Sequence, residues 1–518
     1  MESCKLQLLP YNLYLLSNCN ILKLKKLTIN KRGIIMSKEN EVSSNNQNFE
    51  RVLSKKDIMA LAFGAMIGWG WVVLTGPWIQ KAGSVGAILA FIIGGIVVLF
   101  VGLTYAELTS AMPKCGGDLV FSYRALGRKA AFICTWGMIL GYISVVAFEA
   151  VAFPSVLENL FSFSYLKGYM YTIAGYDVYA SWALIGSISA IIITIVNYFG
   201  AKPAAFMQTV VTVMIACVGI ALFTGSLFNG SIQNMSPMFV TGTSGKGILA
   251  VAIMTPFMYV GFDVIPQAAE EINVPFKKIG KILILSVIMA VIWYAMIIYS
   301  TSVALDSNEI ASSSLVAADA MKKMFGNSVV ASKILILAGI GGILTSWNSF
   351  FMGGSRAIYS MAEAGMLPKF LAKIHPKYKT PTNAVILIGL VSSIAPLFGE
   401  KMLVWLSNAG GFGILISYLI VSISFLVLRK REPNMERPYK VKHPKFVGTM
   451  AIILCIGMLI MFMPGLPSGL SLPYEWGIIL TWFLLGGVFY LVANNKAENK
   501  SKDNKYKIDY YENKKVSV

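Results

Sequence analysis

The sequence is poor in the residue types that most often bind metals or carry out catalysis. It has two histidines, His375 and His443, and six cysteines, none of which forms a Cys-x-x-Cys pair. It also lacks a His-Glu-x-x-His segment and a Gly-x-x-x-x-Gly-Lys-Ser/Thr loop. These absences argue against a zinc site, a disulfide framework, a histidine proton relay and an ATP-driven motor. We therefore expect no metal, no cofactor and no enzymatic activity.

Charged residues are scarce as well, at 13% of the 518 residues, whereas 56% are hydrophobic. Soluble domains are about 25% charged and about 45–50% apolar. The apolar residues are gathered in blocks such as Val85–Thr104, and about 20 apolar residues suffice to cross a hydrocarbon core of about 30 Å. The composition therefore indicates one integral membrane domain.

The net charge of +19 comes from lysines and arginines in the tails and in the short connections between apolar blocks. This distribution is typical of residues that set membrane orientation and attract anionic lipid. No nucleic-acid recognition motif accompanies the charge. We expect contact with the lipid bilayer and not with nucleic acid.

Apolar length and breaker residues predict an all-α membrane protein with about twelve transmembrane helices. The expected spans are residues 57–80, 85–109, 129–160, 181–200, 204–228, 246–270, 280–304, 332–360, 382–398, 403–428, 446–464 and 475–494. Loops on the side of the N-terminus carry about three times as many basic residues as loops on the other side. We therefore expect a multi-pass protein of the cell membrane with both termini in the cytoplasm.

The membrane domain is expected to comprise residues 51–495, between a cytoplasmic N-terminal tail of residues 1–50 and a cytoplasmic C-terminal tail of residues 496–518. Residues 1–35 lack the apolar core and the cleavage site of a signal peptide. Met36 opens a polar segment. We interpret residues 1–35 as an extension or a start-site artefact, and a translation start at Met1 or at Met36 stays open.

Two predicted spans contain helix-breaking residues at corresponding places. The first has three glycines within Gly64–Gly70, and the sixth has Pro256 and Gly261. Within a helix, glycine costs about 1 kcal/mol and proline about 3 kcal/mol. Such residues also serve close helix packing. However, these two spans open two successive sets of five, and paired breaks of this kind are typical of the binding site of an inverted-repeat transporter.

An interrupted helix suits a solute that carries both a carboxylate and an ammonium group. Either charge is costly in an apolar interior unless it is paired. The freed N–H groups of a break favour the carboxylate and its freed carbonyl groups favour the ammonium. Glycine also lets a solute approach the backbone closely. The breaks therefore predict a transporter whose solute is an amino acid.

Four groups of motifs follow one another along the chain. They are Gly64–Gly70, Tyr105–Leu108 with Pro113–Asp118, Gly261–Asp263 with Glu270–Pro275, and Ser355–Ala362 with Gly365–Pro368. Together they resemble the amino acid–polyamine–organocation (APC) superfamily of permeases. The resemblance implies a five-plus-five inverted repeat (LeuT-like) with broken helices 1 and 6. It also implies a secondary active transporter that works by alternating access.

The resemblance further implies site residues. The backbone N–H groups of Trp69 and Gly70 are expected to bind the solute carboxylate, and the carbonyl groups of Phe257 and Val260 its ammonium. The full set of candidate substrate contacts is Ala65, Met66, Gly68, Trp69, Gly70, Phe257, Met258 and Val260, with Phe257 and Tyr259 as candidate gates. Trp69 departs from the family pattern, which usually has a small residue there, so its indole is expected to shrink or reshape the pocket.

An ionisable residue, Glu149, lies inside an apolar run and is a functional candidate because of that position. It is a candidate to bind a substrate amine or to carry a coupling proton. A buried structural network or an aqueous vestibule is the alternative. Many related permeases have a glutamate at the position of Gly141, and Glu149 follows two helical turns later on about the same face.

The coupling partner stays open between a proton, a sodium ion and a counter-solute. Some proton-coupled relatives have a lysine in the fifth helix, whereas the matching residue here is Ile215. Coupling through that lysine is therefore excluded. Thr345 and Ser346, with carbonyl groups near Ala65, are candidate sodium ligands, although such residues also join helices by ordinary hydrogen bonds.

Further charged residues are expected in gate or loop-packing ion pairs, or else at solvated helix ends. They are Asp263, Glu270 and Glu271, with Glu107 and Arg356 at comparable depth.

Two alternatives to an amino acid transporter remain. Within transport, the runner-up solute is a polyamine or another organic amine. A solute-sensing receptor or a channel is the alternative of another class. The short, charged tails do not predict a signalling domain, and no repeated polar ring predicts a pore.

Overall fold

The computed structural model describes residues 29–30, 33–34, 49–161, 167–240, 244–399, 401–466 and 469–502. The chain forms two units, residues 1–46 and residues 47–518. In the first unit, strands β1 (Ile29–Asn30) and β2 (Gly33–Ile34) pair antiparallel. All helices of the described chain belong to the second unit. Most of the expected tails, and with them Cys4, Cys19 and Met36, lie outside the described residues.

Ten helical segments of the described chain are long and apolar enough to cross a membrane. They are Lys55–Val73, Ser84–Ala111, Arg128–Phe161, Ala180–Tyr198, Ala205–Asn229, Phe276–Ala304, Val329–Glu363, Met402–Arg431, Pro444–Met461 and Tyr474–Asn494, and the shorter apolar segments are Gly245–Met258 and Thr382–Phe398. Each of the twelve predicted spans overlaps one of these segments. The predicted class, a helical multi-pass membrane protein, is confirmed, whereas the number of twelve stays a prediction.

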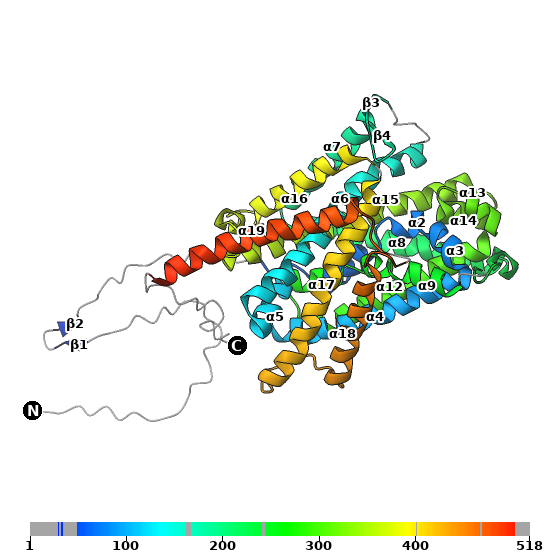
Figure 1. Cartoon of the computed structure of the whole chain (residues 1–518). Coiled ribbons are helices and arrows are strands. Elements are labelled where there is room, and N and C mark those ends of the chain that lie inside the picture. The colour runs from blue at the N-terminus through cyan, green and yellow to red at the C-terminus, as the bar shows by residue number, and fades with distance from the viewer. Residues whose placement is uncertain are drawn as a thin grey trace, which may run out of the picture. The chain divides into compact units, whose positions relative to one another are not determined.

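The helices are numbered in chain order (Figure 1). They are α1 (Lys55–Met66), α2 (Gly70–Val73), α3 (Thr75–Ala82), α4 (Ser84–Ala111), α5 (Gly117–Leu126), α6 (Arg128–Phe161), α7 (Ala180–Tyr198), α8 (Ala201–Asn229), α9 (Ser244–Ala252), α10 (Thr255–Met258), α11 (Val264–Gln267), α12 (Phe276–Ala304), α13 (Ser307–Ser312), α14 (Val316–Met324), α15 (Val329–Glu363), α16 (Thr382–Ile394), α17 (Met402–Arg431), α18 (Pro444–Met461) and α19 (Tyr474–Lys502).

Helix α6 lies at the centre of the packing, in contact with α5, α7, α15 and α17 (Figure 1). Its approach to α17 is close because glycines face each other. A methyl group on Gly137 would lie 2.8 Å from the carbonyl oxygen of Gly413, and one on Gly413 would lie 2.5 Å from that of Gly137. Small residues of this kind let membrane helices approach along their backbones.

A β-hairpin connects α6 to α7, which the sequence did not predict. Strands β3 (Tyr169–Ile173) and β4 (Tyr176–Tyr179) pair antiparallel (Figure 1). Their two-residue turn, Ala174 and Gly175, has φ angles of +52° and +81°, the left-handed conformation that tight hairpin turns need. Tyrosines, Ile173 and Val178 favour an extended backbone here.

Helical structure is interrupted in the two segments with breaker residues. Helix α1 ends at Met66 and α2 begins at Gly70. In the other segment, the chain is not helical between Met258 and Val264. Gly261 has a φ of +140° in this gap, a conformation that residues with a Cβ rarely adopt. The two interruptions position the candidate site.

Candidate functional site

A cavity of about 30 Å³ lies between the two interrupted segments. Its lining comes from the α1–α2 and α10–α11 segments together with α6, α12 and α15, and consists of Ala65, Met66, Gly68, Trp69, Gly70, Val145, Phe148, Glu149, Phe257, Met258, Val260, Tyr294, Ser346 and Phe350. A void needs about 10–15 Å³ of such space to hold one water molecule. This conformation therefore has room for about two waters, and a larger solute requires side chains to move.

All eight substrate contacts predicted from the sequence line this cavity, as do Glu149 and Ser346. Two other candidates do not. The hydroxyl group of Tyr259 donates to the carbonyl oxygen of Phe91 in α4 at 2.9 Å. The hydroxyl group of Thr345 donates to the carbonyl oxygens of Gly64 at 3.1 Å and Gly342 at 3.0 Å.

Several backbone groups at the interruptions have no partner within the described chain. The amide groups of Gly68, Trp69 and Gly70 donate no hydrogen bond to a described residue, and the carbonyl groups of Phe257 and Val260 accept none. Buried backbone groups are normally paired. Donors on one segment and acceptors on the other therefore remain available to a dipolar solute in the cavity.

The indole of Trp69 is accommodated by a glycine on α15. Trp69 is 4% exposed, and a methyl group on Gly339 would lie 2.3 Å from the indole atom Cζ3. The indole thus packs directly against the backbone of α15. Trp69 also lines the cavity, and the expectation that its indole shrinks or reshapes the pocket stays a prediction.

Glu149 reaches the first interruption from α6. It is 2% exposed, and Ser346 donates a hydrogen bond to its carboxylate. Its Oε2 atom has no partner among the described residues. A methyl group on Gly68 would lie 2.8 Å from its Oε1 atom and 3.1 Å from Ser346 Oγ, so glycine is needed where the carboxylate meets the backbone.

Tyr294 of α12 joins the two interruptions, and sequence reasoning missed it. Its hydroxyl oxygen lies 2.8 Å from the carbonyl oxygen of Met66 and 3.4 Å from that of Met258. The ring lines the cavity. In the sequence, Tyr294 is only a tyrosine within an apolar span. Its role could not be predicted, because the residues that it contacts are distant in the sequence.

Comparison with known proteins decides the family. A family profile described as amino acid permease matches residues 53–489. The chain belongs to this family. It is 27% identical over 474 residues to the branched-chain amino acid permease of Bacillus subtilis (strain 168), covering 88% of this chain and 95% of that relative. Two further relatives from the same organism are its methylthioribose transporter, 28% identical with 88% and 95% covered, and its aspartate–proton symporter, 25% identical with 78% of each covered.

Away from the cavity, the permease has buried acids in ion pairs. Glu271 and Arg356 form two contacts, at 2.7 Å and 3.1 Å, with side chains 4% and 2% exposed. The carbonyl oxygen of Glu271 accepts hydrogen bonds from the amides of Val52 and Leu53, at 3.0 Å and 2.9 Å. The ion pair joins the end of the α10–α11 segment to α15, and the carbonyl group of Glu271 binds the segment before α1.

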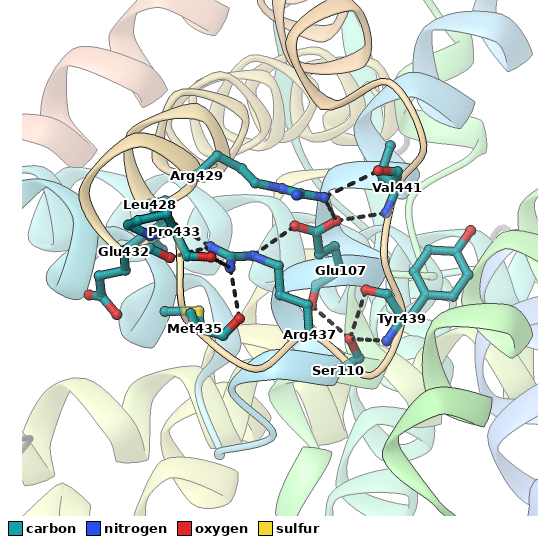
Figure 2. Close-up of polar contacts among 10 residues, drawn as sticks. All are labelled: Glu107, Ser110, Leu428, Arg429, Glu432, Pro433, Met435, Arg437, Tyr439 and Val441. Atoms are coloured by element: carbon teal, nitrogen blue, oxygen red, sulfur yellow. Dashed lines mark hydrogen bonds and ion pairs between the residues drawn. The ribbon is translucent and has the colours of Figure 1, made fainter.

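A second buried acid, Glu107 at the end of α4, lies between two arginines (Figure 2). Its Oε2 atom is 2.5 Å from Arg429 Nη2 and accepts the amide of Val441 at 2.7 Å, while Oε1 is 3.1 Å from Arg437 Nε. Arg437 also donates to the carbonyl oxygens of Leu428 and Glu432. The cluster holds the loop between α17 and α18 against α4.

Proposed function

We propose that this permease is a secondary active transporter that moves an amino acid across the cell membrane by alternating access. The observation that carries the proposal is the cavity between two interrupted helical segments. Amides on one segment and carbonyls on the other have no partner within the described part of the chain. Family membership and relatives that transport amino acids support it. The cavity is small, so the solute would enter a more open state.

The proposed architecture has twelve transmembrane helices arranged as a five-plus-five inverted repeat, with two further helices and both termini in the cytoplasm. The two shorter apolar segments, Gly245–Met258 and Thr382–Phe398, supply the spans beyond the ten longer ones. In the repeat, the α1–α2 and α9–α11 segments are the broken first and sixth helices. A folding reporter fused to each loop would test this topology.

Each side of the cavity has a proposed role. The amides of Trp69 and Gly70 bind the carboxylate, and the carbonyl groups of Phe257 and Val260 bind the ammonium. Phe257 is the proposed gate, because its ring lies 5.9 Å from that of Phe148 across the cavity. Tyr259 would act on the gate only through the backbone, since its hydroxyl group is hydrogen-bonded to the carbonyl oxygen of Phe91 in α4.

Glu149 is the proposed coupling residue. Its carboxylate lies on the cavity wall, and one of its oxygens lacks a partner among the described residues. A proton fits this position, and one of the relatives is an aspartate–proton symporter. Exchange for a counter-solute and sodium coupling through Ser346 are the alternatives. For sodium, the Thr345 hydroxyl is already engaged by two carbonyl groups.

A polyamine or another organic amine is the second candidate solute, and one observation favours it. The partly unpaired carboxylate of Glu149 suits a cation that has no carboxylate of its own. The methylthioribose transporter among the relatives also shows that similarity to this family does not by itself specify an amino acid.

Counterflow into proteoliposomes tests the proposal. Vesicles are loaded with single amino acids, amines or methylthioribose, and uptake of the labelled compound is measured. We expect exchange with a subset of amino acids and none with amines that lack a carboxylate. If such amines exchange as fast as amino acids, the role of the Trp69 and Gly70 amides is wrong. Absence of exchange with every amino acid would overturn the proposed function.

A further inference from the structure

Two buried carboxylates lie beyond the cavity lining, one on the interrupted α10–α11 segment and one on a helix packed against it. Asp263 precedes α11, and Asp118 lies in α5, which packs against α11. Both side chains are fully buried. Along the chain, Asp263 lies between the cavity residue Val260 and Glu271, which pairs with Arg356.

All hydrogen bonds to these two carboxylates come from neutral donors. Asp118 accepts from the hydroxyl group of Tyr105 at 2.5 Å and from the side-chain amide of Gln267. Asp263 accepts from the hydroxyl groups of Tyr142 at 2.5 Å and Tyr418 at 3.1 Å, and from the amide of Gly261 at 2.8 Å. Among the described residues, neither carboxylate has a lysine or arginine within ion-pair distance.

The two carboxylates belong to one packed cluster. The rings of Tyr105, a partner of Asp118, and Tyr418, a partner of Asp263, have centroids 5.7 Å apart. Phe262 packs against both, at 5.5 Å and 5.4 Å. The titratable groups of the described chain that face the cluster are Tyr105 of α4, Cys134 and Tyr142 of α6, Tyr418 of α17 and Cys455 of α18. All of these are neutral near pH 7.

This environment does not support two negative charges. Burial disfavours an ionised carboxylate unless a cation or strong hydrogen bonds compensate it, and a second carboxylate nearby disfavours it further. The ion pairs of Glu107 (Figure 2) and of Glu271 show how this protein neutralises buried acids elsewhere. Here a proton is the available compensating charge.

The amide of Gln267 gives an independent indication of where a proton resides. Its Nε2 atom donates to Asp118, while its Oε1 atom is buried and has no partner among the described residues. A buried amide oxygen without a donor is costly. A protonated Asp118 would supply that donor if the side-chain amide of Gln267 rotated so that its Oε1 atom faced Asp118. Asp118 lies outside the membrane-spanning segments, and burial raises the pKa of its carboxyl to about 8.

We propose that Asp118 and Asp263 form a proton-binding site that holds one proton and releases it when the interrupted sixth helix moves. Proton binding converts one carboxylate to a neutral carboxyl group and needs no other reactant. Asp263 joins the interruption to α6 and α17 through Tyr142 and Tyr418. Movement of this segment would break those bonds and change proton affinity. The inference rests on the proposed function for its coupling role, and it adds a second proton site to the one proposed at Glu149.

The test measures the proton directly, without any solute. Purified protein is titrated, and the carbonyl stretching band of protonated carboxyl groups is followed by infrared spectroscopy in H₂O and D₂O. The variants are Asp118→Asn and Asp263→Asn, which keep the shape of the side chain and replace one carboxylate oxygen with a neutral NH₂ donor. The matched control is Asp177→Asn in the exposed hairpin. We expect a titrating band in the wild type and in the control, and a smaller band in Asp118→Asn, which lacks the contribution of this site.

Transport measurements separate this inference from the proposed function. One proton coupled to a gradient of one pH unit supports about tenfold accumulation. We expect Asp118→Asn to lose this accumulation while counterflow, which needs no net proton movement, stays within about twofold of the wild type. If no amino acid exchanges in the wild type, the proposed function fails, and the infrared titration still decides whether the site binds a proton.

A titrating band that persists unchanged in both asparagine variants would overturn the inference. Should Asp118→Asn fail to fold, Gln267→Leu replaces it. This substitution removes the amide that donates to the ionised carboxylate and accepts from the protonated one, so the titration midpoint is expected to shift. An unchanged midpoint in Gln267→Leu would equally overturn the inference.

Discussion

Buried acids that pair with arginine differ from those around the interrupted segments. Glu107 and Glu271 are almost completely buried, and each is paired with arginine. Glu149, Asp118 and Asp263 are as deeply buried, yet their partners are hydroxyl and amide groups. Burial alone therefore does not distinguish a structural acid from a functional one. The hydrogen-bonding partner distinguishes them. An arginine stabilises the negative charge of the carboxylate, whereas neutral donors allow the carboxylate to take up a proton.

The largest expected effect comes from breaking a charged pair. Arg356→Ala leaves Glu271 buried without its cation, and breaking such a pair costs about 3–5 kcal/mol of stability. Thermal unfolding of the purified protein in detergent measures the loss. The control is Arg124→Ala, which removes the partly exposed pair with Glu432 and should cost about 0–1 kcal/mol.

A double variant sharpens this test. Glu271→Gln combined with Arg356→Met removes both charges, and apolar replacement of a buried pair is often close to neutral. Recovery of most of the stability would show that the lone carboxylate causes the loss. If the double variant is as unstable as Arg356→Ala, packing of the arginine against Phe49, 5.6 Å from its ring centroid, is the cause instead.

The same substitution in the two regions should have opposite results. Glu107→Gln removes the charge that faces Arg429 and Arg437, and hydrogen bonds to charged groups are worth about 1.5–3 kcal/mol. We expect that loss of stability for Glu107→Gln. Its transport should be lowered only in proportion to the amount of folded protein. If wild type and variant have the same melting temperature, the Glu107 cluster does not have the structural role given to it.

Glu149→Gln is the matched variant at the cavity, and it should act on transport. Its carboxylate has no cation among the described residues, so the stability of the variant should stay within about 1 kcal/mol of the wild type or rise. We expect pH-dependent uptake to be abolished, or selectivity for cationic solutes to be lost. Uptake by proteoliposomes at several pH values measures both. An unchanged rate, pH profile and specificity would return Glu149 to a structural role.

The sequence predicted one wall of the candidate site well. Gly64–Gly70 and the segment around Pro256 are local signals, since their breaker residues act where they occur, and all their predicted contacts line one cavity. Glu149 was detectable because a charge in an apolar run is conspicuous. The membrane class followed from composition for the same reason.

What the sequence could not supply was contact between distant segments. Asp118 was part of a recognised motif, yet its burial depends on α5 packing against α6 and α11. Asp263 was expected in an ion pair or at a solvated end, whereas two tyrosines from other helices bind it. The hairpin of β3 and β4 was missed because its two strands are only five and four residues long, which gives little periodicity.

The smallest predicted effect concerns a neutral donor that joins the interruptions. Tyr294→Phe removes the hydrogen bond to the carbonyl oxygen of Met66, and such a bond contributes about 1 kcal/mol. The freed carbonyl faces the cavity, so the variant should bind solute with altered affinity. The control is Tyr299→Phe on the same helix, whose hydroxyl bonds to no described residue. Because Tyr294 holds both interruptions in one geometry, a change in counterflow KM without a change at Tyr299 would assign it to the site. If the two variants have the same counterflow KM, the hydroxyl group of Tyr294 has no role in the candidate site.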